Sequence, residues 1–110
     1  MYIEGNESTF THDGKIFLVD DLLRLSETLE STLLEVNVLS WILEYTSTDV
    51  FRVHKSDITI PIIVLSTSKW GYVVLDGAHR LTKSINEKLS TIHCKVLNEN
   101  EFSKLSCISL

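Results

Sequence analysis

Apolar residues are concentrated in the second half of the chain, in runs that predict three strands. The first is Pro61–Leu65, which is followed by a polar loop over Ser66–Gly71 and by a second run, Tyr72–Leu75. Both runs are rich in β-branched and long apolar residues, and Pro61 opens its strand, where a missing amide does least harm. The intervening loop predicts that they pair as an antiparallel hairpin. The alternation of Ile92–Leu97 predicts the third strand.

The pattern changes from strand to helix at Asp76 and Gly77. Aspartate is a good N-cap, because its carboxylate accepts amides of the next turn, and glycine permits a sharp turn or a close approach to a ligand. We therefore expect a helix from about Ala78. The residues that recur at three- and four-residue spacing form its predicted apolar face: Ala78, Leu81, Ile85 and Leu89.

Cationic side chains follow this turn. His79 and Lys83 lie one helical turn apart, with Asn86, on a side predicted to stay open, and Arg80 lies between the two faces near the helix N-terminus. A strand, a glycine turn, a helix N-terminus and two or three cations together predict a phosphate-binding site. In the structural alternative, the turn is ordinary and the charges are solvated.

The first half of the chain alternates between short strand and helix patterns. Met1–Gly14 is predicted to be a short strand or an irregular lead-in that closes with a turn at His12-Asp13-Gly14, and Ile16–Val19 is predicted to be a strand. Asp20 is predicted to cap a helix that ends near Leu29 or Glu30. The predicted buried side of that helix consists of Leu22, Leu25 and Leu29.

The middle of the chain predicts one more strand and two short helices. Leu34–Val38 alternates apolar and polar residues, which indicates a half-buried strand, and Leu39–Tyr45 is a helix candidate. Its aromatic residues, Trp41 and Tyr45, are expected in core or lid packing rather than as a platform for bases. Phe51–Asp57 is predicted to be a short helix or turn.

At the C-terminal end, Asn98 and Glu101 have the spacing of a capping box for a last helix, Glu99–Leu105. The elements together predict an α+β fold with a small mixed sheet and packed helices.

Composition supports one compact domain over residues 1–110. Hydrophobic residues make up 44% of the 110 residues, with one proline and four glycines, which excludes a disordered or low-complexity chain. The formal charge of −5 argues against broad electrostatic binding to nucleic acid or to an anionic membrane surface. The longest apolar run is far too short to span a membrane, and no export segment is recognisable, so the cytoplasm is the expected location.

The two cysteines, Cys94 and Cys107, are expected to be reduced. Cys94 alternates with Ile92 and Val96, as a small core residue would. His93 and Cys94 are adjacent in a predicted strand and point to opposite faces, so we expect no metal site there.

The segment from Ser56 to Val96 resembles the ParB/sulfiredoxin superfamily. The resemblance rests on Pro61-Ile62-Ile63-Val64 followed by Asp76-Gly77-Ala78-His79-Arg80, and it is closest to small stand-alone members with an Asp-Gly-x-His-Arg-Leu-x-Lys helix. It implies the fold predicted above. It also implies that Ala78 occupies the position of the sulfiredoxin catalytic cysteine, and an alanine has no nucleophile, so sulfiredoxin activity is excluded.

Other members of this superfamily bind nucleotide phosphates at the corner formed by this strand, the glycine turn and the helix N-terminus. Free serine kinases hold nucleotide phosphates there, and ParB proteins bind CTP there. The resemblance assigns Gly77, His79 and Arg80 to such a site, whereas Lys83 is added from helical spacing. Asp57 precedes the Pro-Ile-Ile-Val strand, where the family often carries an acid, so it is a further candidate. A turn carboxylate that caps Ile58 and Thr59 is the competing interpretation.

Three functions remain open at this point. In the first, the chain is an enzyme that binds a nucleotide and transfers or hydrolyses a phosphoryl group, with magnesium held by Asp76 or Asp57. Alternatively, it captures a phosphorylated small molecule or nucleotide signal without turnover. In the third, the motif holds the turn together and the protein acts through a protein partner.

Overall fold

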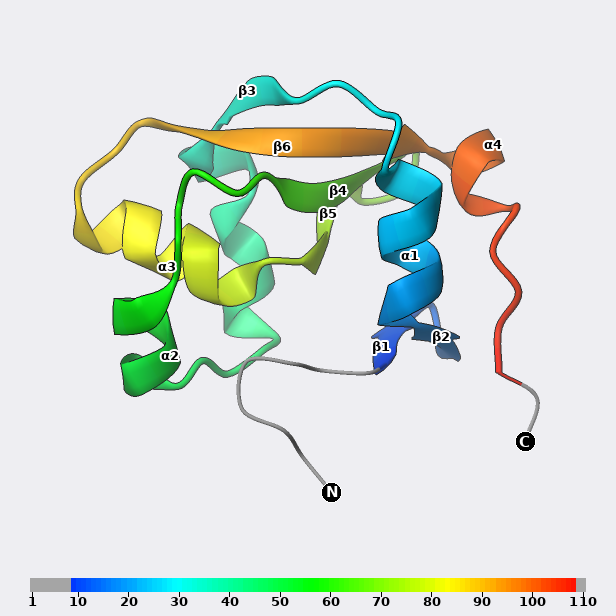
Figure 1. The fold of residues 1–110 in the computed structure, drawn as a ribbon, viewed down its shortest axis with the longest axis horizontal. Helices are drawn as coiled ribbons and strands as arrows, with labels where there is room; N and C mark the ends of the chain where they lie inside the picture. Colours follow the sequence, from blue (N-terminus) through cyan, green and yellow to red (C-terminus); the bar gives the residue numbers. More distant parts are fainter. Residues whose placement is uncertain (1–8, 109–110) are drawn as a thin grey trace.

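The computed structural model describes residues 9–108, which form an α+β fold built on a four-stranded mixed sheet (Figure 1). The strand order is β3-β6-β4-β5, and β4 pairs parallel with β6 and antiparallel with β5. The sheet strands are β3 (Thr32–Glu35), β4 (Ile62–Thr67), β5 (Gly71–Asp76) and β6 (Thr91–Asn98). The predicted hairpin and the third predicted strand are therefore confirmed.

The central strand β4 is buried on both faces of the sheet. Ile62 and Val64 pack into one hydrophobic cluster, and Ile63 and Leu65 pack into the other. This division follows from the two-residue period of a strand, which sends successive side chains to opposite faces. An uninterrupted apolar run is the pattern expected of a strand that is covered on both sides.

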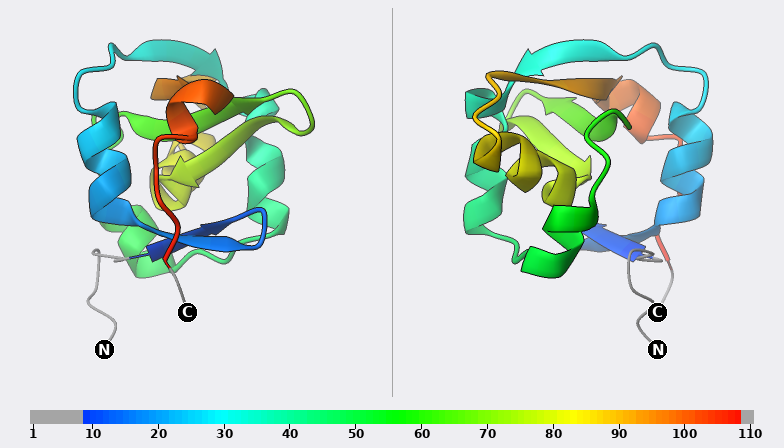
Figure 2. Two further views of the ribbon diagram at one scale, coloured as in Figure 1. Left: turned by 90° about the vertical axis from the view of Figure 1, so that its right-hand side faces the viewer. Right: turned by 60° about the vertical axis from the view of Figure 1, so that its left-hand side comes forward.

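Each face of the sheet is covered by different elements. Leu81 of α3 (Ala78–Asn86) and Leu39, between two 3-10 helices, belong to the cluster on one face. Leu22 of α1 (Val19–Ser26) belongs to the cluster on the other face, which Phe102 of α4 (Glu99–Phe102) also contacts. Figure 2 shows the sheet between these two groups of helices.

The N-terminal strands β1 (Thr9–His12) and β2 (Lys15–Leu18) form a separate two-stranded hairpin. Its turn is at Asp13 and Gly14, whose φ angles of 52° and 75° suit a tight two-residue turn, so the turn predicted there is confirmed. Residues 1–8 of the predicted lead-in lie outside the described residues. Rings of Phe10 and Phe17 stack at 5.3 Å and join the hairpin to Phe102.

The predicted strand over Leu34–Val38 is wrong in its second half. The strand β3 ends at Glu35, and Val36–Val38 form a 3-10 turn, η1. The amide of Val36 donates to the carbonyl of Ser90 at 2.9 Å, and the Val36 side chain is buried. The chain therefore turns into the core where the alternating pattern suggested that it stayed extended.

The helix predicted over Leu39–Tyr45 is a 3-10 helix, η2 (Ser40–Glu44). Trp41 is partly buried, and its indole N–H donates to the carbonyl of Tyr72 at 2.9 Å, which confirms its packing role. Tyr45 is 77% exposed and contacts Trp41 only edge-on, so its expected burial is wrong.

The first helix begins and ends earlier than predicted. Helix α1 starts at Val19, its N-cap is Leu18, and no side chain caps it, so Asp20 lies inside the first turn and is not the cap. The helix ends at Ser26, which is before Leu29. Leu22 is fully buried, whereas Leu25 and Leu29 are only partly buried against the same cluster.

Two further helix predictions are confirmed with shorter limits. Helix α2 (Val50–Lys55) begins one residue before the predicted range 51–57 and ends two residues before its end, and α4 ends at Phe102 rather than Leu105. The capping box is present, because the amide of Glu101 donates to Asn98 at 2.7 Å and the amide of Asn98 donates to Glu101 at 2.9 Å. No helix of residues 9–108 is long and apolar enough to cross a membrane.

The His12 ring predicts a pH dependence of stability. Partial burial lowers the pKa of His12 below its ordinary value of 6.5, against an opposing effect of the Asp13 charge. The unfolded chain therefore takes up a proton at a higher pH than the folded chain does, so the free energy of unfolding should fall as the pH drops below about 6.5. Urea denaturation from pH 7.5 to 5.5 should show a smaller decline in His12→Gln than in the parent. Equal declines would contradict this prediction.

Candidate functional site

The predicted corner begins at Gly77, whose backbone is pressed against β4. Its φ is 121°, a conformation that L side chains rarely adopt. A Cβ atom at this position would lie 2.3 Å from Cγ2 of Ile62. The glycine is therefore required by the packing of the β5–α3 turn on the central strand, whether or not a ligand binds there.

Asp76 does not cap helix α3, contrary to the prediction. It is the last residue of β5, the N-cap is Gly77, and no side chain accepts a hydrogen bond at this helix end. The Asp76 carboxylate instead accepts from Arg80 at 2.8 Å. Because no side chain caps α3, its first-turn amides keep the partial positive charge of a helix N-terminus.

Arg80 joins three segments at this corner. Besides its ion pair with Asp76, its guanidinium donates to the carbonyl of Pro61 at 2.9 Å and to that of Ile60 at 3.3 Å. The Arg80 side chain is 16% exposed and that of Asp76 is 31% exposed. The pair is thus partly shielded from water, which strengthens it, and part of each side chain still reaches the solvent.

The prediction that Lys83 and His79 lie on an open face of the helix is wrong. The ammonium of Lys83 donates to the carbonyls of Ser56 at 2.7 Å and His54 at 3.0 Å, at the C-terminal end of α2. A cation there is favoured by the negative end of the helix dipole. His79 Nε2 accepts the amide of Asp49 at 3.1 Å. Both side chains therefore hold α2 and its leading loop against α3.

The predicted apolar face of α3 is correct at its start and wrong at its end. Leu81 and Ser84 are fully buried, and the Ser84 hydroxyl donates to the carbonyl of Arg80 at 3.0 Å. Ile85 is 37% exposed, and Leu89, at 41% exposed, lies beyond the helix end at Asn86. The serine is buried because its hydroxyl is satisfied within the helix, a possibility that polarity alone does not reveal.

Asp57 forms a local turn beside the same corner. Its carboxylate accepts from the hydroxyl and the amide of Thr59, at 2.5 and 3.0 Å. These bonds lower the pKa of Asp57, and the charges of Lys83 and Arg80 lower it further to a smaller extent. The competing interpretation of Asp57 as a turn carboxylate is therefore confirmed for its contacts with Thr59. The residue also lies within electrostatic range of the two cations.

A hollow of about 340 Å³ lies between α2 and α3 beside this corner. Lys83 lines it together with His54 and Thr82, whereas Asp76, Gly77 and Arg80 do not. Among residues 9–108, no group of three or more histidine, cysteine or acidic side chains is placed to hold a metal ion. The corner is thus a partly exposed ion pair at a helix end, not a deep cleft.

The sequence patterns did not identify the contribution of Asp49. Its carboxylate accepts the amide of Phe51 at 3.0 Å and caps α2, while its own amide contacts His79. A polar run that ends in aspartate immediately before Val50 is a usable N-cap signal in the sequence. Its contact with His79 joins residues 30 apart, and no local pattern predicts such a contact.

The two thiols differ in reactivity because they differ in burial. Cys94 is fully buried, and burial raises the pKa of its thiol to about 11, whereas Cys107 is exposed. The thiolate is the reactive form, so a disulfide reagent at pH 8 should modify one thiol per folded chain rapidly. Cys107→Ser should remove this fast reaction, and denaturant should expose the second thiol. Two fast thiols in the folded parent would contradict the burial of Cys94.

No family model and no curated protein sequence match the chain. Among solved structures, its fold is similar to that of sulfiredoxin from Arabidopsis thaliana, with a TM-score of 0.52 and 19% identity. The similarity covers 67% of this chain and 93% of that chain. Identity this low shows the fold alone. The α+β, sulfiredoxin-like fold expected from the sequence is therefore confirmed.

Proposed function

We propose that the chain binds a phosphate-bearing small molecule, such as a nucleotide, at the N-terminus of α3. The observation that carries this proposal is the partly exposed Arg80–Asp76 pair beside a helix end that no side chain caps. Helix N-termini favour anions, and an arginine next to one supplies charge-assisted hydrogen bonds to phosphate oxygens. The sulfiredoxin-like fold supports the proposal only as a similarity of architecture.

Arg80 would exchange one anion for another when the ligand binds. Its bonds to the carbonyls of Ile60 and Pro61 hold the guanidinium in place, and the bond to Asp76 occupies an edge that a phosphate would take over. A phosphate that displaces Asp76 would contact both Arg80 and the amides of the first turn. In this proposal, Lys83 and His79 act as positioning residues that hold α2 against α3.

Capture without turnover fits these residues better than phosphoryl transfer does. Magnesium is commonly held by one or two carboxylates together with phosphate oxygens, and Asp76 and Asp57 would be the carboxylates at this corner. Asp76 is paired with Arg80 and Asp57 is bonded to Thr59, so neither carboxylate is poised as a base. Turnover is therefore the second candidate, and it depends on a magnesium-bound nucleotide that releases Asp76.

A thermal-shift screen tests the proposal. The purified chain is mixed with ATP, GTP, CTP, UTP, tripolyphosphate or inorganic phosphate, each with and without magnesium. A ligand present at 100 times its Kd should stabilise the fold by about 2.7 kcal/mol, which raises the Tm of a chain of this size by roughly 10 °C. No shift with any of these probes at millimolar concentration would contradict phosphate binding.

Asp76→Asn distinguishes capture from magnesium-dependent turnover. Without magnesium, this variant should bind the phosphate ligand more tightly than the parent, because Arg80 no longer has a competing carboxylate. If the site uses magnesium, the variant should lose the part of the affinity that depends on the metal. Release of phosphate from the nucleotide, measured over hours, then reports turnover directly. Weaker binding by Asp76→Asn without magnesium would contradict the exchange of anions at Arg80.

A further inference from the structure

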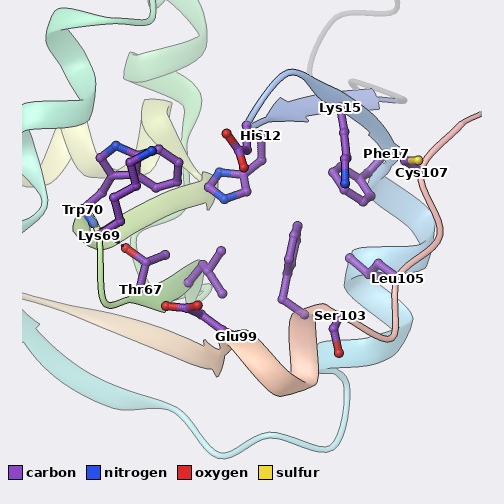
Figure 3. Close-up of a pocket in the computed structure, with 13 residues that line it drawn as sticks. His12, Lys15, Phe17, Thr67, Lys69, Trp70, Glu99, Ser103, Leu105 and Cys107 are labelled. Carbon is purple, nitrogen blue, oxygen red and sulfur yellow. Dashed lines mark hydrogen bonds between the residues drawn. The ribbon is translucent and has the colours of Figure 1, made fainter.

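A second and larger hollow lies at the opposite end of the β4–β5 hairpin from the Arg80 corner. Its volume is about 580 Å³, and side chains of both hairpins, α4 and the C-terminal segment line it (Figure 3). Strand β5 runs from Gly71, next to this hollow, to Asp76 at the corner, so the two places are about 16 Å apart along the strand. The volume falls within the range of small-molecule sites in proteins.

The wall of the hollow is aromatic. The His12 ring stands edge-on to the rings of Trp70 and Phe102, with centroid separations of 5.4 and 5.3 Å. The ring centroids of Phe17 and Phe102 are 5.1 Å apart. Trp70 is 40% exposed, a large fraction for a tryptophan packed beside other rings. His12 adds little charge to this wall at neutral pH, because burial lowers its pKa. Such a wall suits a planar apolar group, which aromatic side chains contact by stacking and edge-to-face packing.

Two lysines supply the charge at the edge of this wall. Lys15 extends from β2 into the hollow, and its ammonium has no hydrogen-bond or ion-pair partner among residues 9–108 (Figure 3). Lys69 lies over the Trp70 ring at 4.8 Å. Of the two acids at the edge, Glu99 accepts the amide of Ser68, and Asp13 lies in the β1–β2 turn. The Asp13 charge also acts on His12, so each acid already has a polar neighbour, whereas Lys15 points into the hollow and is the charged group placed to meet an anion.

We propose that this hollow binds a small planar aromatic molecule that carries one anionic group. The ring packs against His12, Trp70 and Phe102, and the anion pairs with Lys15 and Lys69. The site is independent of phosphate binding at Arg80, because none of the residues at the Arg80 corner lines it. An aromatic carboxylate can stack on the rings and pair with Lys15, whereas an aromatic cation would have to compete with the Ser68 amide for Glu99 and with His12 for Asp13.

The test is an NMR titration of the isotope-labelled chain with 2-naphthoate and, separately, with 2-naphthylmethylammonium. We expect 2-naphthoate to shift the amide signals of both hairpins and of α4, and to bind at least about tenfold more tightly than the cation. Lys15→Gln combined with Lys69→Gln should remove that preference. The matched control, Lys55→Gln with Lys88→Gln, removes the same net charge outside the hollow and should leave the binding unchanged.

Trp70→Leu separates the aromatic contribution from the charge, and it should weaken 2-naphthoate binding about tenfold while the fold persists, because the side chain lies on an exposed hairpin. Three results would each overturn the proposal. They are chemical shift changes confined to residues 76–80, equal affinity for the cation, and no saturable shift changes at millimolar 2-naphthoate. None of these results bears on nucleotide binding at Arg80, except that shifts at residues 76–80 would show that anions prefer that corner.

Discussion

Gly77→Ala is expected to reduce the free energy of unfolding by about 2 to 6 kcal/mol. The change combines backbone strain of about 1 to 3 kcal/mol with overpacking of about 1 to 3 kcal/mol. Both causes are specific, since φ is 121° and the new Cβ would lie 2.3 Å from the Ile62 side chain. Ile62 is fully buried in the central strand and has little room to move. Urea denaturation of the parent and the variant measures the difference.

Gly71→Ala is the matched control for this change. Gly71 also has a positive φ, 72°, but nothing lies within 4 Å of the position that its Cβ would occupy. The free energy of unfolding of this variant should fall only by the backbone-strain contribution, about 1 kcal/mol. If the two variants lost equal stability, the contact of Gly77 with Ile62 would not be the cause. The free energy of unfolding of a typical domain is only about 5 to 15 kcal/mol. The larger side chain of Gly77→Val should therefore leave little folded protein.

Arg80→Ala is expected to weaken binding of a phosphate ligand at least about 30-fold, which corresponds to roughly 2 kcal/mol for lost charge-assisted hydrogen bonds. The same variant should also lose about 1 to 3 kcal/mol of stability, because the carbonyls of Ile60 and Pro61 and the Asp76 carboxylate lose their donor. Calorimetry well below the Tm of the variant separates the affinity from the stability.

Two further variants test whether the effect belongs to this guanidinium. Arg80→Lys keeps the charge but cannot reach two carbonyls and a carboxylate at once, so its affinity should lie between those of the parent and the alanine variant. Arg24→Ala removes another arginine that is paired with an aspartate, but its side chain is 72% exposed. It should change stability by less than about 0.5 kcal/mol and leave binding unchanged. Unchanged affinity in Arg80→Ala would place the phosphate site elsewhere.

Strand β4 shows why much of the fold was predictable. Four successive apolar residues, Ile62–Leu65, bounded by a proline and a polar loop, predict a strand covered on both faces, and each of them is buried. The capping box at Asn98 was predictable for the same reason, because both of its hydrogen bonds lie within four residues. Local steric and hydrogen-bonding rules are sufficient where the partners are close in the sequence.

Several of the errors lie where a distant part of the chain decides the local structure. Val36 continues an alternating pattern, yet its amide bonds to Ser90 and the chain turns there. Ile85 fits a helical apolar stripe, but the sheet lies on the Leu81 and Ser84 side, so Ile85 remains exposed. Spacing describes which residues share a face of a helix, and it does not determine how far the neighbouring layer extends over that face.

The sequence by itself determined the strands of the central hairpin, the glycine turn and the placement of Arg80 near a helix N-terminus, since these depend on residues within one turn or one strand. Only the tertiary structure decided what the charged side chains do. Asp76 pairs with Arg80 instead of capping the helix, and Lys83 binds carbonyls at the end of α2, up to 29 residues away in the chain. A long flexible cation pairs with whichever acceptors packing brings within reach, and packing of separate segments is not encoded in local spacing.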